Sequence, residues 1–283
     1  MRSLEWALAA GRTVWRAIDH NSVVLASDKR WRLMPAGALV VSVLVVFDFV
    51  NSKWGIGEAN QWDLMLAVFN DPFKAMVLLP VGFFALVADA ITRDWHGWGY
   101  LSWSRYKYRL VWWVGKLGGI ALAVLMYLSI LVIIVLITSA VAATVEVSWS
   151  TLVHVSEWTY PGGLAVDQLD IPPGLIMLEM LGLMSVGLIS LGTVVAVIAF
   201  WARQPVIAWI CGVVMAGTSY GVWLAWPWAA VWAPTLHLAL GAHAEISNRV
   251  PGFFTIGTSL LFFMGLWLLA AVLGYVRVVR QDF

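Results

Sequence analysis

Histidines are the side chains of this sequence best suited to acid–base or metal chemistry, and two of the five, His237 and His243, stand six positions apart with Glu245 nearby. A zinc site needs three or four converging ligands, and a spacing of six does not place two side chains on one face of a helix. We therefore expect hydrogen bonding at these histidines, and no metal site. A membrane-embedded enzyme is an alternative, but no His-Glu-x-x-His motif occurs, and the one Gly-x-Ser-x-Gly match, Gly217 to Gly221, lies inside a long apolar run.

Two carboxylates, Asp48 and Glu179, interrupt long apolar runs near one end of each run. Charges inside membrane-spanning segments are costly and often functional. These two residues are therefore candidates for lining a substrate path. The phosphate-binding motif Gly-x-x-x-x-Gly-Lys-Ser/Thr is absent from the sequence, so we expect no nucleotide cofactor on this chain.

Apolar runs dominate the sequence, in which 61% of the 283 residues are hydrophobic and 12% are charged. A soluble domain has roughly 45–50% apolar and about 25% charged residues, and each run is long enough for a hydrocarbon core of about 30 Å. The sequence thus predicts an all-α integral membrane protein with a six-span transmembrane domain over residues 33–283. The six predicted spans cover residues 33–50, 73–91 with a kink at Pro80, 110–143, 174–201, 206–226 and 253–276.

Basic residues predict the orientation of these spans. With both termini in the cytoplasm, only Lys53, Lys74 and Arg249 of the 17 basic residues fall outside, whereas acidic residues show the reverse bias. Basic residues gather on the cytoplasmic side of membrane proteins. We therefore expect a multi-pass protein of the cell (cytoplasmic or inner) membrane.

The first 32 residues precede the first span, and their apolar residues recur at roughly helical spacing, at Leu4, Leu8, Trp15 and Ile18. This pattern predicts an amphipathic helix along the inner membrane surface. It can act as a connecting helix that also contacts a cytoplasmic partner, or as a plain anchor.

Residues 88–120, between the second and third spans, form a short segment that is rich in basic and aromatic side chains. They can form a helical hairpin under the membrane that receives force from a docked motor, or an interfacial loop. Residue types alone favour the loop, and Lys116 is expected to extend its side chain to the inner surface.

This segment resembles the cytoplasmic loop of the permease subunits of type 2 ABC exporters. In that family an acidic residue ends the second span. It is followed by a charged stretch, a glycine, a serine-containing turn and an arginine, and the pair Gly-Lys begins the third span. The matching residues here are Asp89, Arg93, Asp94, Gly97, Ser102, Ser104, Arg105 and the pair Gly115-Lys116. The amphipathic start, the six spans and a half-buried outer stretch before the last span, here residues 227–251, also resemble the family.

The resemblance implies two permease chains, identical or paralogous, that work with two separate ATPase subunits, which carry ATP and Mg²⁺. It implies that a coupling loop over residues 89–116 receives the motion of the ATPases. The expected coupling residues are Asp89, Arg93, Asp94, Gly97, Ser104, Arg105, Arg109 and Lys116.

The resemblance also implies where the two permease chains meet, because spans one and five form that seam in the family. Two Gly-x-x-x-Gly pairs could support helix contacts, Gly115 with Gly119 and Gly217 with Gly221. The pair on span five, Gly217 and Gly221, is the expected dimer contact. Membrane lipids are further partners, and nucleic acid is not. A motor-independent membrane scaffold or immunity protein is the remaining alternative.

Overall fold

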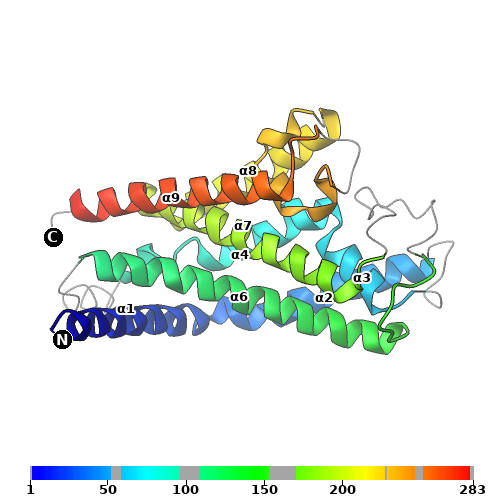
Figure 1. Cartoon of the computed structure of the whole chain (residues 1–283), viewed down its shortest axis with the longest axis horizontal. Helices are drawn as coiled ribbons and strands as arrows, with labels where there is room; N and C mark the ends of the chain where they lie inside the picture. The colour runs from blue at the N-terminus through cyan, green and yellow to red at the C-terminus, as the bar shows by residue number, and fades with distance from the viewer. Residues whose placement is uncertain are drawn as a thin grey trace.

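The computed structural model describes residues 2–51, 59–95, 109–152, 170–226, 228–245 and 251–280, and within these ranges the chain is helical apart from turns and one β-bridge. The main helices lie roughly along one axis, and α1 begins and α9 ends at the same end of the bundle (Figure 1). The elements are α1 (Arg2–Ala26), α2 (Lys29–Asn51), α3 (Gln61–Phe69), η2 (Lys74–Leu78), α4 (Leu79–Val87), η3 (Thr92–Trp95), α6 (Arg109–Ala142), α7 (Pro173–Ala202), α8 (Pro205–Ala225), η7 (Ala230–Trp232), η8 (Leu236–Leu238), η9 (Leu240–Ala242) and α9 (Ile256–Arg280).

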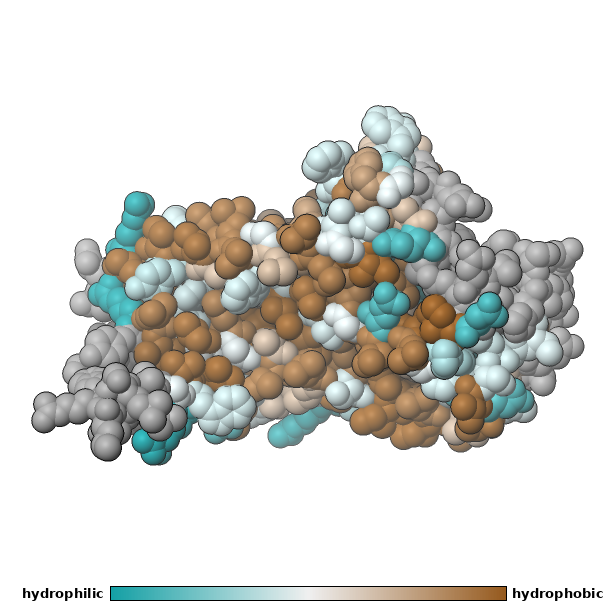
Figure 2. All heavy atoms as spheres, in the orientation of Figure 1, coloured by the Kyte–Doolittle hydropathy of each residue, from teal (hydrophilic) through white to brown (hydrophobic). Residues whose placement is uncertain are grey.

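Five of these helices, α2, α6, α7, α8 and α9, are long and apolar enough to cross a membrane. A sixth crossing is present if α3 and the helix over residues 74–87 form one broken span, bent by 56°. Hydrophobic residues cover most of the face shown in Figure 2. The expectation of an all-helical chain is therefore confirmed over the described residues, and the six predicted spans correspond to five candidate helices, or to six if the bent pair is one span.

The second candidate span differs from its prediction in both its start and its bend. It begins at Gln61 rather than at residue 73, and the bend lies between Phe69 and Lys74 rather than at Pro80. Asn60 caps α3, whose side chains are almost all buried. Pro80 instead lies within the helix over residues 74–87, just after the π-helical turn Lys74–Leu78.

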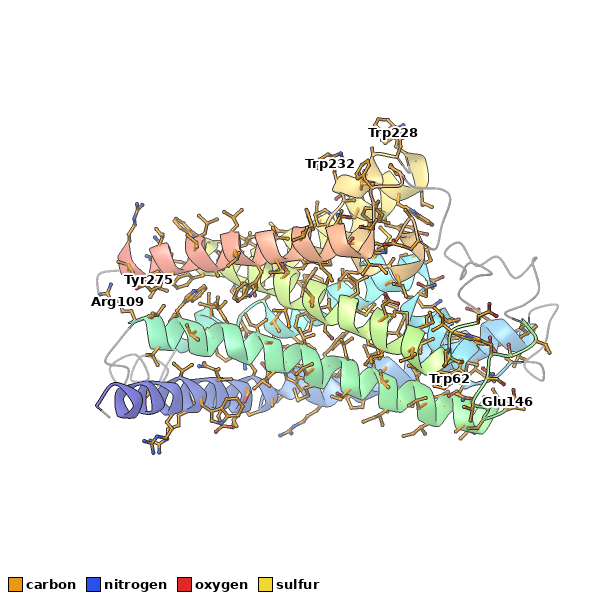
Figure 3. All side chains as sticks on the ribbon, in the orientation of Figure 1. Trp62, Arg109, Glu146, Trp228, Trp232 and Tyr275 are labelled. Atoms are coloured by element: carbon orange, nitrogen blue, oxygen red, sulfur yellow. The ribbon has the colours of Figure 1, made fainter. Side chains whose placement is uncertain are left out.

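Residues after α6 hold α3 in place. Asn60 and Thr144 form a β-bridge, and the indole Nε1 of Trp62 donates to the carbonyl oxygen of Glu146 at 2.9 Å (Figure 3). Ser150 donates to the buried carboxylate of Asp63 at 3.0 Å. These polar bonds explain how a segment with a polar start packs inside an apolar bundle.

Helix α7 is the most buried candidate span, and α8 and α9 are among the least buried. Close packing of α7 depends on Gly187, where an added Cβ would lie 2.2 Å from Leu238 and 2.6 Å from Phe263. The outer segment that contains Leu238 and helix α9 therefore pack directly against the centre of the bundle.

The segment predicted to re-enter the membrane, residues 227–251, is described over residues 228–245, where it forms three short 3₁₀ turns, η7, η8 and η9. Leu236 to Ala242 are buried, whereas Trp228 and Trp232 are exposed and project from the bundle (Figure 3). Broken backbone of this kind is compatible with membrane depth only where protein buries it. Its re-entry into a membrane stays a prediction.

Candidate functional site

Four charged residues meet where α1 gives way to α2 and where α4 ends. Arg30 donates to Asp28 and to Asp89, each at 2.7 Å. Arg93 donates to the same two carboxylates, at 2.5 Å and 2.9 Å. Each arginine thus bridges both aspartates, and we name this cluster of Asp28, Arg30, Asp89 and Arg93 the ion-pair junction.

Local backbone geometry places Asp28 at the junction. Its side chain accepts a hydrogen bond from the backbone N–H of Arg30 at 2.8 Å, which is the capping interaction expected of an aspartate at a helix start. Hydrogen bonding to the Arg30 guanidinium lowers the pKa of Asp28 to about 2, and Arg93 acts in the same direction. Asp28 therefore stays ionised and caps α2 while it binds both arginines.

The two arginines also bind the last carbonyl groups of neighbouring helices. Arg30 donates to the carbonyl of Ala85 near the end of α4 at 2.6 Å, and Arg93 donates to that of Val24 near the end of α1 at 3.2 Å. Helix ends leave such carbonyls without partners inside the helix. The junction consequently ties the end of α1, the start of α2 and the end of α4 to one another.

Lys116 binds the same region from α6. Its side chain is 3% exposed, its Nζ donates to the carbonyl of Ala90 at 3.1 Å, and it lies 5.5 Å from the ring centroid of Trp112. The expectation that Lys116 reaches the surface is therefore wrong, because its ammonium group finds an internal carbonyl and an aromatic face instead. Since Ala90 follows Asp89 directly, Lys116 joins α6 to the ion-pair junction.

Glycines let α1 approach the first part of α6, and the two helices lie side by side in Figure 1. An added Cβ at Gly115 would lie 2.8 Å from Ala17, and one at Gly119 would lie 3.0 Å from Asn21. This Gly-x-x-x-Gly pair therefore serves packing inside the chain. The position of α1 on a membrane surface stays a prediction.

Arg109, at the start of α6, is exposed and contacts the end of α9. It donates to the carbonyls of Val279 at 2.6 Å and Val278 at 3.3 Å. Figure 3 labels Arg109 together with Tyr275, which lies on the same part of α9. A cation at a helix C-terminus is favourable because it meets the last free carbonyl groups. The segment between the second and third spans is thus attached at both of its ends.

The structure brings together Asp89, Arg93 and Lys116 of the expected coupling residues and places Arg109 against α9. The backbone of Asp94 lies in η3. Gly97, Ser102, Ser104 and Arg105 lie outside the described residues.

Asp28 and Arg30 were missed by the sequence analysis. The signal that could have found them is Ser-Asp-Lys-Arg directly after an amphipathic helix, since aspartate before a helix start is a capping signal.

The two candidates for a substrate path, Asp48 on α2 and Glu179 on α7, are both exposed on the surface of the single chain. Gly217 and Gly221 lie on α8, where an added Cβ would meet no other atom within 4 Å. Both pairs are therefore open to lipid or to another chain.

The two histidines that the sequence singled out, His237 and His243, are buried and form hydrogen bonds. Within the described ranges no three His, Cys, Asp or Glu side chains converge in a way that could hold a metal ion. Both imidazoles contact Ser259 on α9, a residue that no sequence motif indicated.

The chain matches no protein-family model, and no curated protein is significantly similar to it.

Proposed function

We propose that this chain is the membrane-spanning subunit of an ATP-driven type 2 ABC exporter in the cell membrane. It forms a substrate path with a second permease chain and is coupled to separate ATPase subunits. The observation that supports this proposal most directly is the ion-pair junction. The junction attaches the segment after the second candidate span to α1, α2 and α4, and Lys116 adds α6. A force on that segment would reach four helices at once.

The position of the ion-pair junction along the length of α6 is compatible with the cytoplasmic boundary of the membrane. Gly119 packs against Asn21 and Leu25 near the end of α1. From Gly119 to Ala142 the helix rises roughly 34 Å at 1.5 Å per residue, close to a hydrocarbon core of about 30 Å. In this placement α1 lies outside the core, which fits the exposed Arg12 and Arg16 on α1.

In the proposed mechanism, closure of two ATPases on ATP pushes the segment over residues 89–116 together with α1. The push tilts the attached spans and shifts the path between the two permease chains toward the outside. Asp48 and Glu179, exposed on the single chain, would then face that path, and Gly217 and Gly221 would face the partner chain. A substrate is moved only if it binds the two states with different affinity.

An enzymatic function has less support. Among the described residues, the place where a hydroxyl meets two potential bases is Ser259 with its two histidines, and Ser259 is fully buried. A substrate cannot reach a buried nucleophile without opening the bundle. A scaffold or immunity protein stays a rival, because it needs a stable surface and no transmitted force.

The decisive experiment is copurification of the native complex from membranes, followed by mass spectrometry of its proteins and retained small molecules. We expect an ATPase subunit in the complex, ATP hydrolysis by the complex and none by the purified chain alone. A native protein that works with no nucleotide-hydrolysing partner would overturn the proposal.

Charge reversal tests whether the motor docks on the expected coupling loop. Arg105→Glu with Arg109→Glu should weaken ATPase capture and transport, because both side chains belong to the expected coupling loop. Arg249→Glu, in a segment expected on the other side of the membrane, is the matched control. Intact assembly and transport in the double variant would show that the motor does not dock there.

A further inference from the structure

The hydroxyl of Ser259, in the first turn of α9, lies between two imidazoles. His237 Nδ1 is 2.8 Å from its Oγ, and His243 Nε2 is 2.7 Å from the same atom. The far nitrogen of each ring faces a backbone carbonyl, with Val231 at 2.9 Å and Leu240 at 3.0 Å. These four close contacts thus form one continuous series of polar atoms, which begins and ends at a backbone carbonyl oxygen.

The number of protons in this chain of contacts can be counted. A carbonyl oxygen only accepts, a neutral imidazole carries one N–H, and a serine carries one O–H. The three neutral side chains therefore supply three protons for four contacts. Whichever tautomers are chosen, one contact brings two lone pairs together at 3.0 Å or less. One additional proton satisfies all four contacts, whereas a second would make both rings donors to the hydroxyl and leave its own proton without an acceptor among these contacts.

Aromatic rings around the site favour a cation. His237 stacks on Phe262 with ring centroids 4.2 Å apart, and His243 stacks on Phe254 at 4.8 Å. An imidazolium over an aromatic face is stabilised by the negative face of the ring.

Charged groups near the site are few among the described residues. Burial lowers the pKa of His243, and the carbonyl of Leu240 and the charge of Glu245, on the same outer segment, offset this only in part. On the elements packed against the site, Glu179 of α7 is exposed, Lys74 of η2 pairs with Asp71 at 3.6 Å, and the arginines of α9 lie in its last turn. Burial lowers the pKa of His237 to about 4. The site is therefore neutral at pH 7 and gains its proton under acid conditions.

We propose that His237, Ser259 and His243 form a binding site for a single proton, which the two imidazoles and the hydroxyl share. The site joins the outer segment over residues 228–245 to the start of α9, so its charge changes the contact between them. This inference rests on the geometry of the three side chains and holds whether or not the chain is an exporter.

Proton uptake can be counted by nuclear magnetic resonance of the full chain in lipid bilayers. The variant His20→Gln, His96→Gln, His154→Gln retains only the two histidines of the site, and ¹⁵N labelling of histidine then reports their four ring nitrogens. As the pH falls from 8 to well below the midpoint of the site, we expect two protonated nitrogens to become three. Folding at each pH is checked by size-exclusion chromatography.

Ser259→Ala tests whether the hydroxyl links the two rings. Loss of a hydrogen bond to a charged group should weaken proton binding about tenfold, which lowers the midpoint by about one pH unit. Ser42→Ala removes an equally buried hydroxyl, one that donates to Ala38 at 2.9 Å on α2, and should leave the midpoint unchanged.

Uptake of one proton together with the shift in Ser259→Ala supports the proposal. Uptake of two protons, no uptake before the protein unfolds, or an unchanged midpoint in folded Ser259→Ala would overturn it. If Ser259→Ala does not fold, the proton count in the parent variant decides the question alone.

Discussion

Replacement of Arg93 by glutamine should destabilise the chain by about 2 kcal/mol. Arg93 contributes two ion pairs and one hydrogen bond to a carbonyl, at 23% side-chain exposure. At this partial exposure each interaction is worth about 0.5–1 kcal/mol. The loss also leaves Asp28 and Asp89 to share Arg30 alone, and their repulsion adds to the cost.

A loss of about 2 kcal/mol corresponds to a fall of roughly 4–8 °C in melting temperature for a chain of this size. The 19 tryptophans make intrinsic fluorescence a suitable readout of melting in detergent. Arg16→Gln is the control, because Arg16 is exposed on α1. A melting temperature for Arg93→Gln within 1 °C of both the parent and this control would refute the reasoning.

A double-mutant cycle isolates the contact between Arg93 and Asp28. Asp28→Asn removes the charge but keeps a side chain that caps helices well. The two single losses should then sum to about 1 kcal/mol more than the loss in the double variant, because the 2.5 Å contact is lost only once. Strictly additive losses would mean that this contact contributes nothing measurable.

Three further predictions concern the acid response and the two glycine faces. Because Asp28 has a folded-state pKa of about 2, below its ordinary value of 3.8, its contribution to stability is complete above about pH 5 and is lost as the pH falls through 2. In Asp28→Asn the melting temperature should therefore fall less over that range. Gly115→Val should loosen α1, because its Cβ would lie 2.8 Å from Ala17; we expect a loss of about 1–3 kcal/mol and faster proteolysis of α1, and equal proteolysis would contradict this packing. Gly217→Val should leave the melting of the single chain unchanged, since its Cβ meets no other atom within 4 Å, but should lower the dimer fraction measured by cross-linking, and an unchanged fraction would remove α8 from the seam.

The long apolar helices could be predicted from the sequence because hydrocarbon length alone selects them. The predicted third span, residues 110–143, nearly coincides with α6. Helix α3 is capped locally by Asn60, but it could not be found from run length, because the polar bonds that hold it to residues 144–150 come from a distant part of the chain.

The candidate site was predictable only in part. Charge pattern and resemblance selected Asp89, Arg93 and Lys116, but no local signal shows that Arg30, 59 positions before Asp89, completes the same cluster. Lys116 shows the limit of reasoning from residue type, because a lysine near a helix start usually reaches solvent. Here the carbonyl of Ala90 and the ring of Trp112 offer its ammonium group an internal place.

Helix α9 connects Arg109, at the end of the expected coupling loop, to the histidine site. Arg109 binds the carbonyls of its last turn, and the two histidines contact Ser259 in its first turn. With 25 residues the helix is about 37 Å long, and a regular helix transmits axial displacement with little loss. In the exporter that we propose, motion of the segment over residues 89–116 would thus arrive at the histidines. Since coupling between two binding sites is reciprocal, any change that ATP binding makes in proton affinity would equal the change that the proton makes in ATP affinity.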